Sequence, residues 1–372
     1  MVGAEPRTLS LRELNRALLA RQMLLGREET SALEAVRWLA GLQSQVPNPP
    51  YLGLWTRLRG FARDDLTGLI EDRRVVRSSM MRATLHLTTA EDYLLLRPSI
   101  QAALERSQRS IAGKRLEGLD LDRLVSEARA MVEEEPRTFK EIQERLVETD
   151  PDRDPSALAY LVRMRLPLVQ TPPAGVWGRG GSPRFALPEP WLGAPLADPD
   201  ESLRALLFRY LAAFGPAGVK DFQAWSGLTG AKALVEEMRP ELSLFTDEDG
   251  RELFDVPGAP LPAADTPAPP RFVPEYDNLV LGHSDRRRVI ADEDRKKVFL
   301  SAARVRATIL IDGFVAGVWK IEKTRRSATL TVEPFVPLSS RDREALAEEG
   351  ERLLKFATDG QPELDVRFEN AG

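Results

Sequence analysis

The 372-residue sequence contains no cysteine and only two histidines, His86 and His283. The absence of cysteine excludes disulfides, thiolate zinc sites, iron–sulfur clusters and cysteine nucleophiles. Two histidines are too few for a multi-histidine metal site, so we expect neither a metal nor another cofactor. The P-loop, the Rossmann glycine fingerprint and the HExxH and GxSxG motifs are also missing. Any catalysis must therefore use ordinary side chains.

Long apolar runs are absent as well. No stretch approaches about 18 consecutive apolar residues, and the first residues lack the apolar core of a secretory signal. We therefore expect no membrane contact and a cytoplasmic location. Hydrophobic residues make up 42% of the chain and charged residues 29%, which is typical of a folded globular protein.

The net charge of −5 is unevenly distributed along the chain. Residues 1–116 contain 18 basic and 12 acidic residues, whereas residues 117–200 contain 10 and 16, and residues 201–372 contain 24 and 29. One basic module on an acidic remainder predicts a localised surface for binding a polyanion. Arginine supplies 43 of the 52 basic residues, which suits phosphate contacts, although a GC-rich genome produces the same bias.

A pattern of helices followed by a strand pair recurs three times along the first 257 residues. This order is typical of the winged-helix variant of the helix-turn-helix, in which the hairpin forms the wing. The fold class predicted from the sequence is therefore α+β, with three tandem winged-helix motifs at 1–116, 117–198 and 199–257. Winged helices bind DNA or serve as protein contacts, and the repeats alone leave both roles open.

The C-terminal part of the sequence has a different pattern. Residues 257–271 hold six prolines, which predicts a semi-rigid linker over 258–271. Beyond it, short strands are expected at 272–273, 279–281, 298–300, 307–311, 314–320 and 328–332, followed by a helix at 340–356 and a closing strand at 364–368. We predict a small β-barrel with one helix over residues 272–372.

The most unusual local feature is Gly41-Leu42-Gln43-Ser44-Gln45, which precedes three prolines within four residues. In an extended segment, positions two apart point the same way, so the amides of Gln43 and Gln45 should converge. Each amide both donates and accepts hydrogen bonds, and the pair can therefore orient one water molecule. The structural alternative is that both amides only cap a helix end and satisfy the loop.

Three further groups are candidate contacts to DNA. Arg82, Thr84 and His86 belong to a basic segment with alternating apolar residues, in which Thr84 and His86 share the polar face of a strand. The alternative for His86 is a structural histidine bonded to the backbone.

The second group is Arg286, which belongs to a run of three arginines. The third is Lys323, Arg325 and Arg326 at a hairpin tip, which could reach into a groove of DNA. A solvated turn is the alternative for this tip.

Several segments, taken in order, resemble the AlkZ-type winged-helix DNA glycosylases, a family that includes azinomycin-resistance, AlkZ-like and YcaQ-related proteins. The segments are Gly-Leu-Gln-Ser-Gln at 41–45, Arg-Ala-Thr-Leu-His-Leu at 82–87, Pro-Glu-Tyr-Asp-Asn-Leu at 274–279, His-Ser-Asp-Arg at 283–286 and Ile-Asp-Gly-Phe-Val-Ala-Gly-Val-Trp at 311–319. The resemblance covers about residues 8–370. It implies three winged helices and a C-terminal β-barrel.

The resemblance also implies an activity. The family hydrolyses the N-glycosidic bond of alkylated purines, notably N7-alkylguanine, and unhooks interstrand crosslinks. Its catalytic Gln-x-Gln signature matches Gln43 and Gln45, with Ser44 where an aliphatic residue is more common. The YcaQ-like branch has aspartate at the second position, so Gln45 indicates the AlkZ-like branch. The implied partner is double-stranded DNA that carries alkylated purines, bound by a monomer.

Neutral amides suit a cationic leaving group. An N7-alkylated guanine leaves without protonation, and the remaining barrier is that of an oxocarbenium-like sugar. No lysine occurs in residues 1–113, which disfavours Schiff-base lyase chemistry and predicts an abasic product. If a carboxylate were required, Asp64 and Asp65 would be the first to test.

Two other classes of function would also explain the repeats. A non-catalytic winged-helix DNA-binding or regulatory protein would explain the basic module, and an interaction scaffold would use the wings as protein contacts. Neither explains the Gln-Ser-Gln segment.

Overall fold

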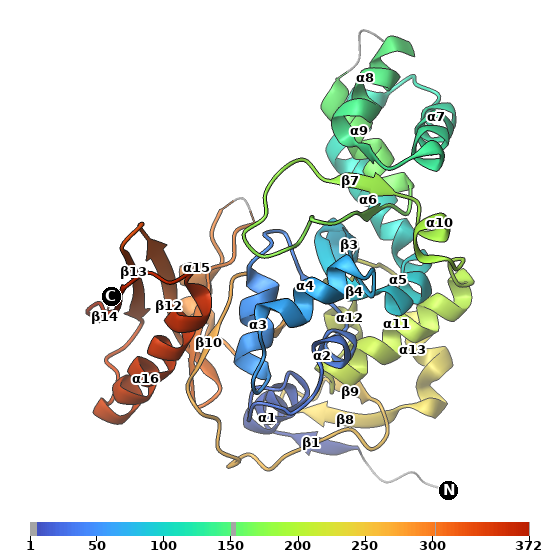
Figure 1. The fold of residues 1–372 in the computed structure, drawn as a ribbon. Helices are drawn as coiled ribbons and strands as arrows, with labels where there is room; N and C mark the ends of the chain where they lie inside the picture. Colours follow the sequence, from blue (N-terminus) through green and yellow to red (C-terminus); the bar gives the residue numbers. More distant parts are fainter. Residues whose placement is uncertain (1–5, 150–153, 302, 372) are drawn as a thin grey trace, which may run out of the picture.

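The computed structural model describes residues 6–149, 154–301 and 303–371. It is a mixed α+β protein, as predicted. Figure 1 shows helices and short strands in a central body, with α7, α8 and α9 at one end and the C-terminal sheet with α16 on another side. Within the described residues, no helix is long and apolar enough to span a bilayer.

The first module contains the elements that later form the site. They are β1 (Arg7–Leu9), α1 (Leu11–Arg21), α2 (Ala32–Trp38), β2 (Leu42–Gln43), α3 (Pro49–Arg57), α4 (Arg63–Glu71), β3 (Val75–Ser79), η1 (Met81–Ala83), β4 (Leu85–Thr89), α5 (Ala90–Leu96), η2 (Pro98–Ile100), α6 (Gln101–Ala112) and η3 (Gly113–Leu116). The helix α1 begins where Ser10 and Glu13 form a capping box, in which each side chain accepts from the other's backbone N–H.

The second and third modules repeat the predicted order of three helices and two strands. The second has α7 (Leu121–Glu134), β5 (Arg137–Thr138), α8 (Phe139–Thr149), α9 (Pro155–Arg165), β6 (Val169–Gln170), β7 (Arg184–Ala186) and α10 (Pro188–Leu192). The third has α11 (Pro199–Phe214), α12 (Val219–Ser226), α13 (Lys232–Met238), η4 (Arg239–Glu241), β8 (Ser243–Asp247) and β9 (Glu252–Asp255). This order of elements is confirmed, whereas winged-helix geometry and the module boundaries stay predictions.

The hairpins of the first two modules join into one sheet, which the sequence did not indicate. The strand order is β2-β4-β3-β6-β7-β5, and Arg77 of β3 lies opposite Gln170 of β6. The unpaired backbone groups of each hairpin edge thereby satisfy one another. A second sheet, β1-β8-β9, attaches the N-terminal strand to the third module, with Arg7 opposite Phe245.

The proline-rich segment lies against helix α1. Arg12 donates to the carbonyl of Ala264 at 2.8 Å, and Arg16 donates to the carbonyl of Thr266 at 2.7 Å. A third arginine of the same helix, Arg21, reaches the carbonyl of Pro260 at 3.2 Å. These bonds hold the predicted linker in place.

The prediction of a C-terminal β-barrel is wrong for the part of the chain that the structure describes. Strands β10 (Arg271–Val273), β11 (Thr308–Ile311), β12 (Phe314–Lys323), β13 (Ser327–Pro334) and β14 (Glu363–Phe368) form an open sheet in this order, with β10 and β14 at its edges. Helix α16 (Ser340–Ala357) packs Leu346, Leu353 and Leu354 against the apolar residues of this sheet. Because the helix buries that face, the sheet needs no closure to exclude water.

Two expected strands are helical instead. Residues 279–281 belong to α14 (Asn278–Leu281), because Asp277 accepts from the N–H of Leu279 at 2.9 Å and begins a helix. Val298 ends α15 (Arg295–Val298), which follows η5 (Asp292–Asp294), and Phe299 makes only an isolated bridge to Val305. Short apolar runs do not separate strand from helix by pattern alone.

Candidate active site

Strand β2 carries the Gln-Ser-Gln segment to the edge of the six-stranded sheet. Gln43 lies opposite His86 of β4, and the N–H of Ser44 donates to the carbonyl of Leu85 at 2.7 Å. Gly41 enters the strand with φ +87°, and a Cβ there would lie 2.8 Å from a methyl group of Thr88. This position therefore requires glycine. The extended conformation expected after the helix end is confirmed for Leu42 and Gln43, whereas Gln45 lies in a bend beyond the strand.

Arg77 of β3 fixes the middle of the segment. Its guanidinium donates to the carbonyl of Ser44 at 2.7 Å from Nη2 and to the carbonyl of Gln45 at 3.3 Å. Its Nη1 donates to Oε1 of Gln170. Burial, followed by the nearby charge of Arg163, lowers the pKa of Arg77 to about 10. Sequence reasoning missed Arg77, because one arginine in a strand carries no signal for this role.

The two glutamine amides contact the same short segment but have different surroundings. Gln43 is 8% exposed, and its Oε1 accepts from Nη2 of Arg82 at 2.7 Å. Gln45 is exposed, and its Oε1 accepts from the N–H of Leu85 at 3.4 Å. Neither amide nitrogen has an acceptor among the residues that the structure describes, so both N–H₂ groups are available to a water or a substrate.

Arg82 positions Gln43 from an unusual backbone conformation. Arg82 and Ala83 have φ +56° and +57°, a left-handed conformation that costs non-glycine residues on the order of 1–3 kcal/mol each. Nη1 of Arg82 donates to the carbonyl of Trp225 in α12 at 2.6 Å. Burial, and then the neighbouring Arg286, lowers the pKa of Arg82 to about 10. The structure thus directs the guanidinium of Arg82 inward, although we predicted a DNA contact from the sequence.

His86 and Thr84 also face inward. His86 is 1% exposed, and its Nδ1 lies 3.1 Å from the carbonyl of Thr84. Burial, and then the charge of Arg82, lowers the pKa of His86 to about 3, so the ring is neutral at pH 7. The hydroxyl of Thr84 donates to the carbonyl of Met81 at 3.1 Å. The expected phosphate contact does not fit this arrangement, and the structural alternative describes His86.

Four arginines near the Gln-Ser-Gln segment lack a carboxylate partner. Arg77, Arg82, Arg163 and Arg286 donate only to neutral groups, and no ion pair involves them in residues 6–149, 154–301 and 303–371. Desolvation lowers the pKa of each, yet arginine remains protonated at neutral pH. Their uncompensated positive charge favours a polyanion at this site.

The segment 274–278 closes the site from the C-terminal part of the chain. Asp277 accepts two bonds from Arg57 of α3, at 2.8 and 2.7 Å, and Asn278 donates to the carbonyl of Gly41 at 2.6 Å. A cavity of about 10 Å³ lies between this segment and β2, and it admits about one water molecule. It is lined by Leu42, Gln43, Pro49, Pro50, Gly53 and residues 274–278.

Arg57→Ala is expected to reduce the free energy of unfolding by about 3–5 kcal/mol, because it leaves the Asp277 carboxylate buried without its partner. The side chains of Arg57 and Asp277 are 0% and 2% exposed. Denaturant unfolding measures the effect. The control is Arg59→Ala, which removes a surface pair with Glu29 whose side chains are 69% and 76% exposed, and should change stability by less than about 1 kcal/mol. Equal effects of the two changes would contradict this role of Arg57.

Of the three basic residues in the predicted DNA-binding hairpin, two remain exposed at its tip and one contacts another part of the protein. Nζ of Lys323 donates to the carbonyl of Ala357 at the end of α16. Arg325 and Arg326 remain exposed at the tip, where Arg326 lies 3.8 Å from Glu363 and is 84% exposed. The structure therefore leaves Arg325 and Arg326 available to DNA and assigns Lys323 to an internal contact.

The run of three arginines is also used internally. Arg286 donates to the carbonyl of Val280 at 2.9 Å and lies 4.5 Å from the centre of the Phe299 ring. Arg288 is buried and donates to the carbonyl of Pro216 at 2.9 Å. The sequence prediction that Arg286 contacts DNA is therefore not supported by its direct contacts.

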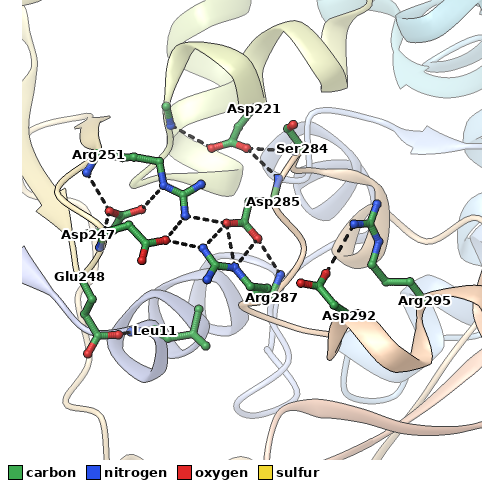
Figure 2. Close-up of polar contacts among 12 residues, drawn as sticks. Leu11, Asp221, Asp247, Glu248, Arg251, Ser284, Asp285, Arg287, Asp292 and Arg295 are labelled. Carbon is green, nitrogen blue, oxygen red and sulfur yellow. Dashed lines mark hydrogen bonds and ion pairs between the residues drawn. The ribbon is translucent and has the colours of Figure 1, made fainter.

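Figure 2 shows the ion-pair network of the remaining arginine of this run, Arg287. It bonds Asp285 at 2.7 Å and Asp249 at 2.6 Å, and Arg251 bonds the same two carboxylates. These pairs raise the pKa of Arg287 and lower that of Asp285. The network fixes the turn of the β8–β9 hairpin beside a cavity of about 600 Å³.

The comparisons with known proteins agree with one another. A family model described as "DNA glycosylase AlkZ-like" matches residues 36–356. The chain belongs to the AlkZ-like DNA glycosylase family. An interstrand DNA cross-link repair glycosylase of Streptomyces sahachiroi is 28% identical over 352 residues, which cover 88% of this chain and 92% of that protein. The structure of Streptomyces sahachiroi DNA glycosylase AlkZ has a similar fold, with a TM-score of 0.81 at 24% identity over 97% of this chain and 100% of that one.

Membership of the AlkZ-like family decides between the classes of function left open by the sequence. The chain is a DNA glycosylase, and its substrate is DNA. Asp64 and Asp65 are the carboxylates considered for a catalytic role, and neither lines the cavity beside Gln43. Asp65 instead accepts from the N–H of Ala62 at the start of α4. No group of three or more metal-ligating side chains occurs in the portions of the chain that the structure describes.

Proposed function

We propose that this AlkZ-like glycosylase releases N7-alkylated guanine from double-stranded DNA and unhooks interstrand crosslinks made through such bases. The Streptomyces relative is named for interstrand crosslink repair. The proposal includes a monomeric enzyme that works in the bacterial cytoplasm on nucleoid DNA. The observation that carries the proposal is the buried amide of Gln43, which Arg82 holds beside a cavity the size of a water molecule.

In the proposed mechanism, Gln43 and Gln45 orient the attacking water. Neither amide titrates near neutral pH, so they contribute position and not proton transfer. The alkylated guanine is already cationic, and its departure leaves an oxocarbenium-like sugar that the oriented water captures. Arg82 fixes the carbonyl end of the Gln43 amide, which leaves its N–H₂ end for the water or substrate.

The proposed DNA-binding surface includes the exposed hairpin tip with Arg325 and Arg326. Phosphate contacts supply most of the affinity of a protein for DNA and make it depend on salt. The surplus charge of Arg77, Arg82, Arg163 and Arg286 supplies a field near the glutamines.

The decisive test is release of 7-methylguanine from methylated duplex DNA, followed by chromatography. We expect free 7-methylguanine and an abasic strand that breaks only after added alkali. No lysine lines the cavity beside Gln43, which favours hydrolysis over Schiff-base chemistry. A borohydride-trapped adduct between enzyme and DNA would contradict this proposal.

Replacing Arg325 and Arg326 together by alanine is expected to weaken DNA binding and to flatten its salt dependence. If each contacts one phosphate, the slope of log K against log salt should fall by about 1–2. The measurement is a titration of undamaged duplex at several salt concentrations. The control replaces Arg129 and Arg145, which lie on α7 and α8 of the acidic second module. An unchanged slope would show that the hairpin tip does not touch DNA.

A further inference from the structure

A carboxylate lies beside the cavity at Gln43. Glu275 follows Pro274 at the end of β10, and both Glu275 and Gln43 line the cavity of about 10 Å³. Gln45 does not line this cavity. Because the volume admits about one water, a single water molecule there would lie beside both Gln43 and Glu275.

The backbone around Glu275 is held firmly. Tyr276 has φ +58°, a conformation that persists in a non-glycine residue only when its surroundings enforce it. The enforcing contacts are the two bonds from Arg57 to Asp277 and the bonds from Asn278 to the carbonyls of Gly41 and Leu39, at 2.6 and 3.1 Å. The backbone at Glu275 is therefore fixed relative to the same strand that carries Gln43.

Glu275 is also the unpaired charge at this cavity. It makes no hydrogen bond or ion pair with any residue that the structure describes, whereas the other acid of the lining, Asp277, is neutralised by Arg57. Across the cavity, Gln43 is bonded to the protonated Arg82. Of the two carboxylates that line this cavity, Glu275 is therefore the one without a partner among the described residues. Its surroundings carry a surplus of positive charge.

The pKa of Glu275 fits this placement. Although Glu275 is exposed, partial desolvation of its carboxyl group by the surrounding protein raises this pKa above its ordinary value. The carboxyl group therefore holds a proton more readily than a fully solvated glutamate. A base of this kind is better matched to accepting a proton from water than an unperturbed carboxylate.

We propose that Glu275 is a further catalytic residue, which accepts the proton of the water that Gln43 orients. This inference rests on the proposed function. The water oxygen forms a bond to C1′ of the damaged nucleotide as the bond from C1′ to N9 breaks. The electron pair of the broken bond neutralises the cationic purine, and the water proton passes to the Glu275 carboxylate. The negative charge of Glu275 also stabilises the oxocarbenium-like sugar.

The test compares single-turnover release of 7-methylguanine by the unaltered protein, Glu275→Gln, Glu275→Asp and the control Glu293→Gln. Glu293 is exposed and lies in η5, away from the cavity. Each rate is measured across about pH 4.5–8.5 after subtraction of spontaneous release, together with DNA affinity and thermal unfolding. We expect Glu275→Gln to lower the rate by about 10²-fold or more, with affinity and unfolding unchanged.

The pH profile separates a proton acceptor from a structural role. The unaltered protein should lose rate as the pH falls through the Glu275 pKa, because only the ionised carboxylate accepts a proton. Glu275→Gln should lack this inflection, Glu275→Asp should keep it at a reduced rate, and Glu293→Gln should match the unaltered protein. A Glu275→Gln rate within about twofold, with the inflection intact, overturns the role of Glu275 alone. Absence of 7-methylguanine release by the unaltered protein overturns the proposed function as well.

Discussion

Gln43→Ala is expected to lower single-turnover excision of 7-methylguanine by about 10²- to 10³-fold while DNA affinity changes little. The amide carbonyl is fixed by Arg82 at 2.7 Å, and its N–H₂ group has no acceptor in the parts of the chain that the structure describes. Removal of the amide therefore removes the group that would orient the attacking water. Affinity depends on phosphate contacts elsewhere and should survive. Rapid-quench kinetics and a binding titration measure the two quantities separately.

Gln45→Ala should also lower the rate of 7-methylguanine excision. Because Gln45 is exposed and its bond to Leu85 is 3.4 Å long, its loss should perturb the fold less than the loss of Gln43. Gln361→Ala, which removes an amide in the loop before β14, is the matched control and should leave both rate and affinity unchanged. An equal loss of binding and turnover in the Gln43 variant would instead support the structural alternative, in which the amides only satisfy the loop.

The choice of lesion should show an equally large effect. A water oriented by uncharged amides gives little help to a poor leaving group, whereas a cationic purine supplies its own activation. We expect fast release of 7-methylguanine, slower release of 3-methyladenine and no detectable release of uracil or 8-oxoguanine. Parallel assays on duplexes that differ only in the lesion measure these rates.

The pH dependence constrains the same mechanism. His86 has its pKa lowered to about 3, so its ring stays neutral and should produce no inflection near pH 6–7. Above the raised pKa of Glu275 the rate should be nearly flat up to about pH 9, because neither glutamine titrates. Robust excision of uracil, or an inflection near pH 7 that His86→Ala removes, would contradict this mechanism.

Several features of the site follow from local sequence. The Gly41 turn and the proline run predict an extended segment after a helix, and β2 lies there. The pattern Thr138 to Glu141 predicts a helix start, and both bonds of that capping box are present at the start of α8. Caps and turns depend on residues three or four positions apart, so single-sequence patterns contain the necessary information.

Other features needed contacts between distant residues. Arg82 was expected to face DNA, yet its guanidinium bonds Gln43 and the carbonyl of Trp225, which is 143 residues away. The six-stranded sheet depends on pairing between β3 and β6, which belong to separate repeats. The barrel was expected from a series of short strands, but closure depends on what covers the sheet, and α16 covers it.

The sequence by itself determined that the protein has no cysteine chemistry, that it repeats a helical unit with a hairpin, and that two amides lie two positions apart just after a helix end. Each of these depends on residue identity or short spacing. Only the tertiary structure decided which charges are paired. It neutralised Asp277 with Arg57 and left Glu275 without a partner at the cavity beside Gln43. The pairing of charges depends on which segments of the folded chain pack together, and Gln43 and Glu275 lie 232 positions apart in the sequence.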